Sequence, residues 1–251
     1  MAACKMIGRV PCAFMGGMVL GLTPLLGAGL PVPDPSVTQG ALDNGLTFLI
    51  RSTDDSTEPV EFRLVINAGS ALEEDDQRGV AHLIEHVGFR STTRYPDGSL
   101  ITKLHSLGSE FGPHVNAFTS FDETVFKLSL DAADPDNVET GLSILREWAG
   151  EMVFSKKAVN AEREVVAAEW SSRLGPNQRL LRQALPILYE GSRYADRLPI
   201  GELESIQSVP IDRIEAFYRQ WYRPDNMAVI ISGPVDPTAI ANSIQANFID
   251  L

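Results

Sequence analysis

Five consecutive residues, His82-Leu83-Ile84-Glu85-His86, bring together two imidazoles and a carboxylate. If this segment is helical, its first, fourth and fifth positions share one side, because successive residues of an α-helix are about 100° apart. His82, Glu85 and His86 would then point into one site while Leu83 and Ile84 face the core. Two neutral imidazoles suit zinc, and a carboxylate beside them suits the removal of a proton from water. The alternative is a pair of surface histidines on either side of a glutamate.

A zinc site that catalyses a reaction needs a third protein ligand, which should come from another element. The stretch 161–170, AEREVVAAEW, offers three candidates on a second expected helix. Glu162 and Glu169 are seven residues apart and so share nearly one face, whereas Glu164 points about 200° away from Glu162. Each could equally belong to a solvated helix face, and spacing alone does not choose among them.

Hydrophobic periodicity predicts alternating strands and helices after residue 40. Short alternating runs predict strands, and apolar residues three or four apart predict amphipathic helices. The expected strands are 46–51, 60–68, a β-rich stretch at 115–130, and 227–232; the expected helices are 79–89, 99–106, 137–152, 157–174, 211–222 and 237–251, the last still running at the final residue. With no internal repeat and no long linker, we expect a single α+β domain over 41–251, with a mixed or antiparallel sheet and helices packed on one face.

The composition is typical of a folded, acidic protein. Of the 251 residues 44% are hydrophobic, and 33 Asp+Glu against 21 Lys+Arg give a net charge of −12. This balance disfavours intrinsic disorder. It also disfavours a nucleic-acid partner, because binding to phosphates needs positive charge. Through electrostatic steering it favours neutral or cationic ligands.

The first 40 residues have the pattern of an export leader. Lys5 and Arg9 precede an apolar, charge-free run over 10–30, which ends in small residues and prolines. We expect a signal peptide at 1–29 and a proline-rich lead-in at 30–40, which puts the mature protein in the periplasm with no stable membrane span after processing. An uncleaved anchor is the alternative, since about 20 apolar residues can cross a bilayer. Cleavage would remove both cysteines, so that no disulfide would stabilise the exported protein.

Four motifs in order along the chain resemble those of the insulinase/pitrilysin family of zinc peptidases. They are GVAHLIEHVGF at 79–89, NAFTSFDETVF at 116–126, EREVVAAEW at 162–170 and FYRQWYRPDNM at 217–227. Within the family, the chain most resembles the periplasmic bacterial zinc proteases. It departs from the family pattern at 87–89, where Val-Gly-Phe stands in place of the frequent Met-x-Phe, and these are packing positions.

The resemblance implies a role for each candidate residue of the metal site. His82 and His86 match the two zinc-binding histidines, and Glu85 matches the general base that activates water for attack on a peptide carbonyl. Glu169 matches the third zinc ligand. Glu162 matches a glutamate that supports the catalytic site without binding the metal.

The resemblance also implies the substrate, the activity and the partners. Asn116 and Ala117 match the edge of a strand that pairs with an extended substrate backbone. The implied activity is that of a zinc metalloendopeptidase acting on unfolded or short peptides, with one zinc ion per chain. In this family the zinc-bearing domain is part of a clamshell of two similar halves, so a second peptidase-like domain or subunit is the expected partner. A catalytically incomplete peptide-binding or assembly subunit is the alternative function.

Overall fold

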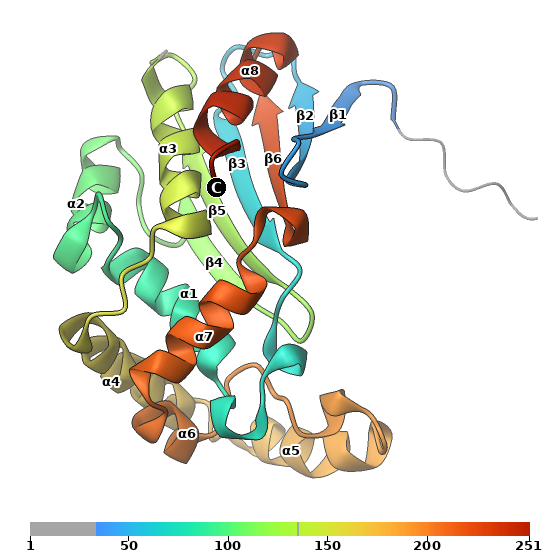
Figure 1. Ribbon diagram of the computed structural model, residues 1–251, viewed down its shortest axis with the longest axis vertical. Coiled ribbons are helices and arrows are strands. Elements are labelled where there is room, and N and C mark those ends of the chain that lie inside the picture. The colour runs from blue at the N-terminus through green and yellow to red at the C-terminus, as the bar shows by residue number, and fades with distance from the viewer. Residues whose placement is uncertain (1–33, 135) are drawn as a thin grey trace, which may run out of the picture. The chain divides into compact units, whose positions relative to one another are not determined.

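A six-stranded sheet organises the residues that the computed structural model describes, 34–134 and 136–251 (Figure 1). Its strands are β1 (Val37–Ala41), β2 (Thr47–Ser52), β3 (Val60–Ile66), β4 (Val115–Thr119), β5 (Thr124–Leu130) and β6 (Met227–Gly233), in the order β1-β2-β6-β3-β5-β4. The neighbours β2 and β6 run parallel, and every other neighbouring pair runs antiparallel. The sheet is therefore mixed, as predicted.

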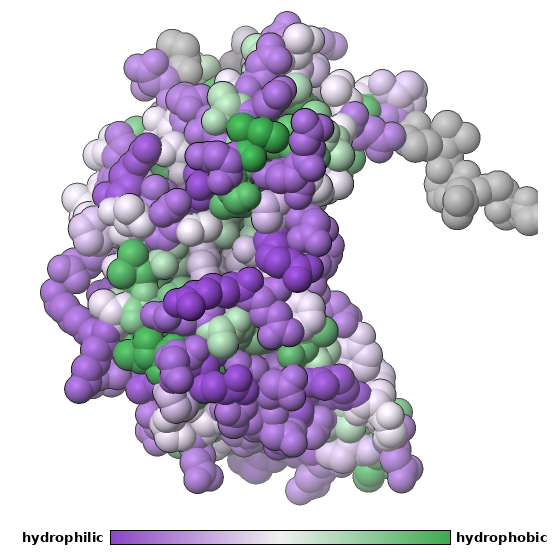
Figure 2. All heavy atoms as spheres, viewed as in Figure 1, coloured by the Kyte–Doolittle hydropathy of each residue, from purple (hydrophilic) through white to green (hydrophobic). Residues whose placement is uncertain are grey.

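One face of the sheet is buried and the other is partly exposed. Along β3 alternate side chains from Val60 to Ile66 are buried, whereas Arg63 between them is exposed. This alternation is typical of a strand with one packed face. Helices α3 (Asp136–Gly150) and α8 (Pro237–Phe248) cover the buried face (Figure 1), which agrees with the predicted α+β fold class. The outer surface of this layer is mostly hydrophilic, with small apolar patches between the polar groups (Figure 2).

A second group of helices lies beside one end of the sheet (Figure 1). These helices are α1 (Val80–Arg90), α2 (Ser99–Ser106), α4 (Lys156–Ser172), α5 (Pro176–Leu188), α6 (Leu203–Ser208) and α7 (Ile211–Trp221). Most residues of α1 are buried, because it contacts α4 and α7 as well as β4 and β5. A helix that is apolar on nearly all sides belongs inside a domain. α1 therefore lies between the sheet and α4, where its polar side chains can meet groups from both.

Several elements differ from the predicted ones. The strand predicted at 60–68 ends at Ile66, and the stretch 115–130 forms the two strands β4 and β5. β1 lies partly in the expected lead-in at 30–40, and its sequence VTQGA shows no apolar alternation that would identify it. The sequence also does not predict α5 and α6, since α5 buries only Leu185 and α6 has six residues.

The prediction that the last helix is still running at the final residue is wrong. α8 ends at Phe248, and the next N–H groups bond back along the chain, Ile249 N–H to Gln245 O and Leu251 N–H to Phe248 O. The final residues thus form a turn in which backbone groups are satisfied locally.

The signal peptide predicted at 1–29 lies outside the described residues. Within residues 34–134 and 136–251, no helix combines the length and the apolar composition needed to cross a membrane.

Candidate metal centre

Helix α1 is anchored at its N-terminus by a buried carboxylate. Gly79 precedes the helix with a φ of +100°, in the left-handed region that glycine tolerates. The side chain of Glu73 accepts hydrogen bonds from the backbone N–H groups of Gly79 and Ala81, each at 2.9 Å. Burial raises the pKa of Glu73 to about 8, although these two bonds and nearby arginine charges oppose the shift. The first turn of α1, which leads into His82, is therefore fixed from within the core.

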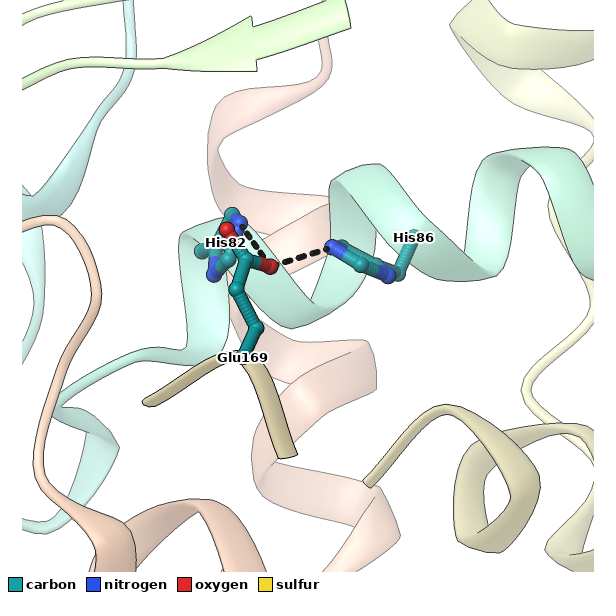
Figure 3. A group of neighbouring side chains, drawn as sticks. All are labelled: His82, His86 and Glu169. Atoms are coloured by element: carbon teal, nitrogen blue, oxygen red, sulfur yellow. Dashed lines mark ion pairs between the residues drawn. The ribbon is translucent and has the colours of Figure 1, made fainter. Parts of the chain in front are cut away.

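Three side chains meet where α1 contacts α4: His82, His86 and Glu169 (Figure 3). Glu169 Oε2 lies 3.7 Å from His82 Nε2 and 3.5 Å from His86 Nε2. The two imidazole rings are nearly perpendicular, with an angle of 84° between them. Neighbouring ligand atoms of a tetrahedral zinc site are about 3.3 Å apart, since each lies about 2.0–2.1 Å from the metal. The types of these donors and their spacing therefore fit a zinc ion.

Glu162 contacts the opposite side of the His86 ring. Its Oε2 lies 3.2 Å from His86 Nδ1, and its Oε1 accepts a hydrogen bond from Arg90 Nε at 2.5 Å. Burial by itself raises the pKa of Glu162, but the hydrogen bonds with His86 and Arg90 outweigh it and the net shift is downward. Glu162 thus contacts Nδ1 of His86, the ring nitrogen that faces away from Glu169. Glu164, the third candidate glutamate, is exposed and lies outside this group.

The two histidines differ in their electrostatic surroundings. Burial, with the charges of His86 and Arg173, lowers the pKa of His82 to about 3. Its Nδ1 is buried and has no hydrogen-bond partner among the described residues. Burial also lowers the pKa of His86, but the bond to Glu162 and the neighbouring carboxylates outweigh it, so that the net shift is upward. Because a neutral imidazole is the form that binds a metal, His82 is in its metal-binding form at neutral pH.

Glu85 lies on the same helix, and a strand residue holds its carboxylate. Thr119 Oγ1, at the end of β4, donates a hydrogen bond to Glu85 Oε2 at 2.6 Å. Burial raises the pKa of Glu85, while the bond from Thr119 and the charge of His86 oppose the shift. A raised pKa suits a carboxylate that takes up a proton. Sequence reasoning missed Thr119, although its position two residues after Ala117, on the same strand face, could have suggested it.

Arg173 is a second residue of this centre that the sequence analysis missed. Its guanidinium bonds to Glu169 Oε1, which leaves Glu169 Oε2 directed toward the two histidines. The two residues are four positions apart, the spacing at which opposite charges meet on a helix. That spacing is the signal in the sequence that could have identified it.

Asn116 and Ala117 belong to β4, which is an edge strand of the sheet. A cavity of about 430 Å³ has both residues in its wall, together with His82, Glu85, His86 and Glu169. A second cavity of about 530 Å³ lies on the Glu162 side of His86, and its apolar wall consists of Phe89, Ile101, Phe111 and Val165. Space for a ligand therefore exists on both sides of His86.

Comparison with known proteins identifies related sequences along most of the chain. A family model described as insulinase (peptidase family M16) matches residues 49–187, and one described as the peptidase M16 inactive domain matches residues 208–251. The chain is 41% identical to the probable zinc protease PqqL of Haemophilus influenzae over 85% of its own length, and 36% identical to the probable zinc protease PqqL of Escherichia coli over 89%. It covers 23% and 24% of those two proteins, so it spans about a quarter of their length.

A solved structure matches the fold and the sequence together. The first half of the periplasmic protease PqqL from Escherichia coli superposes on the chain with a TM-score of 0.82 at 35% identity. The match covers 87% of this chain and 47% of that one.

Proposed function

The chain belongs to the insulinase family of peptidases, peptidase family M16, and from this premise we propose that it is a zinc-dependent metalloendopeptidase that hydrolyses peptide bonds in unfolded peptides. One observation carries the proposal. His82, His86 and Glu169 converge at spacings that fit zinc, and the buried carboxylate of Glu85 lines the same cavity. This combination supplies the donors for a metal and a group that can take a proton from water.

Each residue of the candidate metal centre has a different proposed role in the reaction. His82, His86 and Glu169 would hold one zinc ion, and the hydrogen bond that His86 Nδ1–H donates to Glu162 would orient the His86 ring. Bound zinc supplies a Lewis acid that polarises a peptide carbonyl and lowers the pKa of water. Glu85 accepts the proton from the attacking water and can pass it to the amine that leaves. Burial of Glu85 supports this role, because the upward shift of its pKa favours the protonated form that it must adopt.

The substrate is proposed to pair with β4. An extended peptide can add a strand to a free sheet edge through main-chain hydrogen bonds. Asn116 and Ala117 lie on such an edge and beside the metal centre. This mode needs a flexible backbone more than particular side chains, which supports unfolded or short peptides as the substrate class.

The location and the domain organisation extend this proposal. Export by cleavage of the predicted signal peptide at 1–29 would place the peptidase domain, predicted at 41–251 and preceded directly by most of the sheet strand β1, in the periplasm. The name of the similar Escherichia coli protein, a periplasmic protease, supports this location. A second peptidase-like domain or subunit is proposed as partner, because the chain corresponds to about half of that first-half structure.

A catalytically incomplete peptide-binding or assembly subunit is the second candidate function. The observation that favours it is the length relation, since the chain spans about a quarter of the zinc proteases that it resembles. Substrate positioning can contribute several kcal/mol to catalysis. One part of a two-halved clamshell could therefore bind zinc and peptide with little turnover.

Metal removal and restoration separate the two candidates. The chain is incubated with a flexible, internally quenched peptide before chelation, after chelation, and after zinc is added back. The peptidase proposal predicts hydrolysis that is lost with the metal and regained with it. Hydrolysis that the chelator leaves unchanged would contradict it, and zinc and peptide binding without turnover would favour the incomplete subunit.

A further inference from the structure

Thr119 connects the two parts of the proposed site. Its hydroxyl donates to Glu85 Oε2 at 2.6 Å, and its backbone is the last residue of the edge strand β4. We infer that Thr119 is a positioning residue, which couples the pairing of a substrate strand at β4 to the orientation of the Glu85 carboxylate. This inference rests on the proposed function and adds a residue to it.

The Thr119 hydroxyl donates its one hydrogen bond to Glu85. The other hydroxyl nearby is that of Thr124, 3.5 Å from Thr119 Oγ1. Thr124 uses its own hydrogen in a bond to Ala68 O at 2.9 Å. A hydroxyl has one hydrogen to donate, so Thr119 directs its single hydrogen to the shorter contact, Glu85 Oε2. One oxygen of the carboxylate is thereby fixed, and the other, Oε1, takes part in none of the side-chain hydrogen bonds found among the described residues.

The backbone of Thr119 faces the free edge of the sheet. Residues of an antiparallel pair alternate between hydrogen-bonded and non-hydrogen-bonded positions. Ser120 N–H donates to Glu123 O and Ser129 N–H donates to His114 O, which puts the even-numbered residues 114–120 in the bonded positions. Ala117 and Thr119, opposite Phe126 and Thr124, are therefore in non-bonded positions with their main-chain groups directed outward. A strand added at this edge would bond to the same residue that holds Glu85.

The end of β4 is held in a fixed position relative to the chain that precedes α1. Ser70 N–H donates to Ser120 O at 3.1 Å, and Ala71 N–H donates to Phe121 O at 2.8 Å. Gly69 lies against the same turn so closely that a Cβ there would be 2.3 Å from Ser120 O. The end of β4 and the Thr119 hydroxyl therefore keep one position, and a peptide paired at β4 would lie at a defined distance from the Glu85 carboxylate.

The test compares Thr119→Val, which keeps the shape and removes the hydroxyl, with Thr119→Ser, which keeps the hydroxyl. Thr38→Val, on the exposed strand β1 at the opposite edge, is the matched control. On the quenched peptide, Thr119→Val should lower kcat about 10- to 100-fold, the range for loss of one hydrogen bond to a charged group. KM and zinc content should stay at the wild-type values. Thr119→Ser should recover most of the lost kcat, and Thr38→Val should match the wild type.

Crystal structures of the wild type and of Thr119→Val give a readout that does not depend on activity. The inference predicts that the Glu85 carboxylate turns away from its wild-type position in the variant. A carboxylate that stays in place overturns the inference, whether or not the wild type hydrolyses peptide. An unchanged kcat in Thr119→Val overturns it as well, and so does an equal loss in Thr119→Ser or a rise of KM in place of the fall in kcat. If the wild type shows no chelator-sensitive hydrolysis, the proposed function is contradicted. The positions of the Glu85 carboxylate in the two crystal structures then still show whether Thr119 positions it.

Discussion

His86 and Glu169 each direct one atom toward a shared point because their other polar atom is engaged elsewhere. Glu162 engages His86 Nδ1, and Arg173 engages Glu169 Oε1. Outer partners of this kind orient the groups that bind a metal and raise its affinity. His82 Nδ1 has no such partner among the described residues. The side chain is instead restricted by its buried position on α1.

The first prediction concerns which glutamate binds the metal. Glu169→Gln should lower zinc affinity most, because it removes the negative donor that faces both histidines. Glu162→Gln should lower affinity about 10- to 100-fold, as expected for an outer partner, and Glu85→Gln should leave zinc content unchanged. Competition with a chromophoric chelator measures the three affinities. Loss of zinc in Glu162→Gln but not in Glu169→Gln would show that the third ligand is assigned wrongly.

The sequence predicts the residues on α1 better than their partners. The spacing of His82, Glu85 and His86 follows from one helical turn, so a local pattern suffices. Thr119 and Arg173 reach the site through tertiary packing and through a helix end, and the local signals that they carry, two residues after Ala117 and four after Glu169, become informative only once Ala117 and Glu169 are assigned to the site. The choice among the glutamates at 162, 164 and 169 likewise depends on which side of α4 meets α1, which spacing alone does not reveal.

At the scale of elements, the position of α1 depends on the cap that Glu73 provides. Burial raises the pKa of Glu73 from an ordinary value of 4.5 to about 8. Between these two values the folded state binds one more proton than the unfolded state, so the free energy of unfolding falls as the pH rises and levels off above about pH 8. The stabilising contribution is fully present below pH 4.5.

The second prediction follows from this cap. Glu73→Gln cannot lose a proton, so its free energy of unfolding should fall less between pH 5 and pH 8 than that of the wild type. Urea unfolding of both metal-free proteins at several pH values measures the difference. Equal pH dependence in the two proteins would argue against a titrating Glu73.

The third prediction concerns the turn that holds β4. Gly69→Ala should destabilise the protein by about 1–3 kcal/mol, a cost typical of overpacking. A Cβ there would come within 2.3 Å of Ser120 O and 2.6 Å of Phe121 O. Gly175→Ala is the control, since a Cβ at that position would meet nothing within 4 Å. Thermal unfolding that ranks the two variants equally would contradict the close contact.

The elements that the sequence predicts well are those with strong apolar periodicity. α1, α3 and β6 combine several buried apolar residues at regular spacing. β1 is identified by its pairing with β2, and α5 buries a single residue. Neither element therefore has an apolar periodicity from which the sequence could predict it. The end of α8 depends on local backbone bonds near Phe248, which hydrophobic spacing does not encode.

At the scale of the whole molecule, the proposed pairing of substrate at the outer edge of β4 would determine which molecules can be bound. β4 ends the sheet beside the candidate metal centre. At its outer edge Val115 already bonds to Glu110 and Gly112, and Ala117 N–H donates to the Asn116 side chain, so an added chain would have to be extended and would replace the bond of Ala117. A folded protein has its backbone groups already paired, so it offers no strand for this edge. Conformation should therefore select substrates more strongly than sequence.

The fourth prediction follows from this selection. A small protein that is folded with its disulfides intact should resist cleavage, and the same protein, reduced and alkylated so that it unfolds, should be cut at several sites. Mass spectrometry of both digests under identical conditions gives the comparison. Equal cleavage of the two forms would contradict strand pairing at β4 as the mode of binding.

The most direct test of the central claim is the rate of hydrolysis of a flexible quenched peptide by Glu85→Gln beside the wild type, at equal zinc content. We expect the wild type to cleave the peptide and Glu85→Gln to lose at least about 100-fold in kcat, because a general base contributes about 10²- to 10⁴-fold. Zinc bound equally by both proteins would show that the metal centre itself is intact. Hydrolysis by Glu85→Gln at the wild-type rate would contradict the assignment of Glu85 as the base and, with it, the proposed peptidase mechanism.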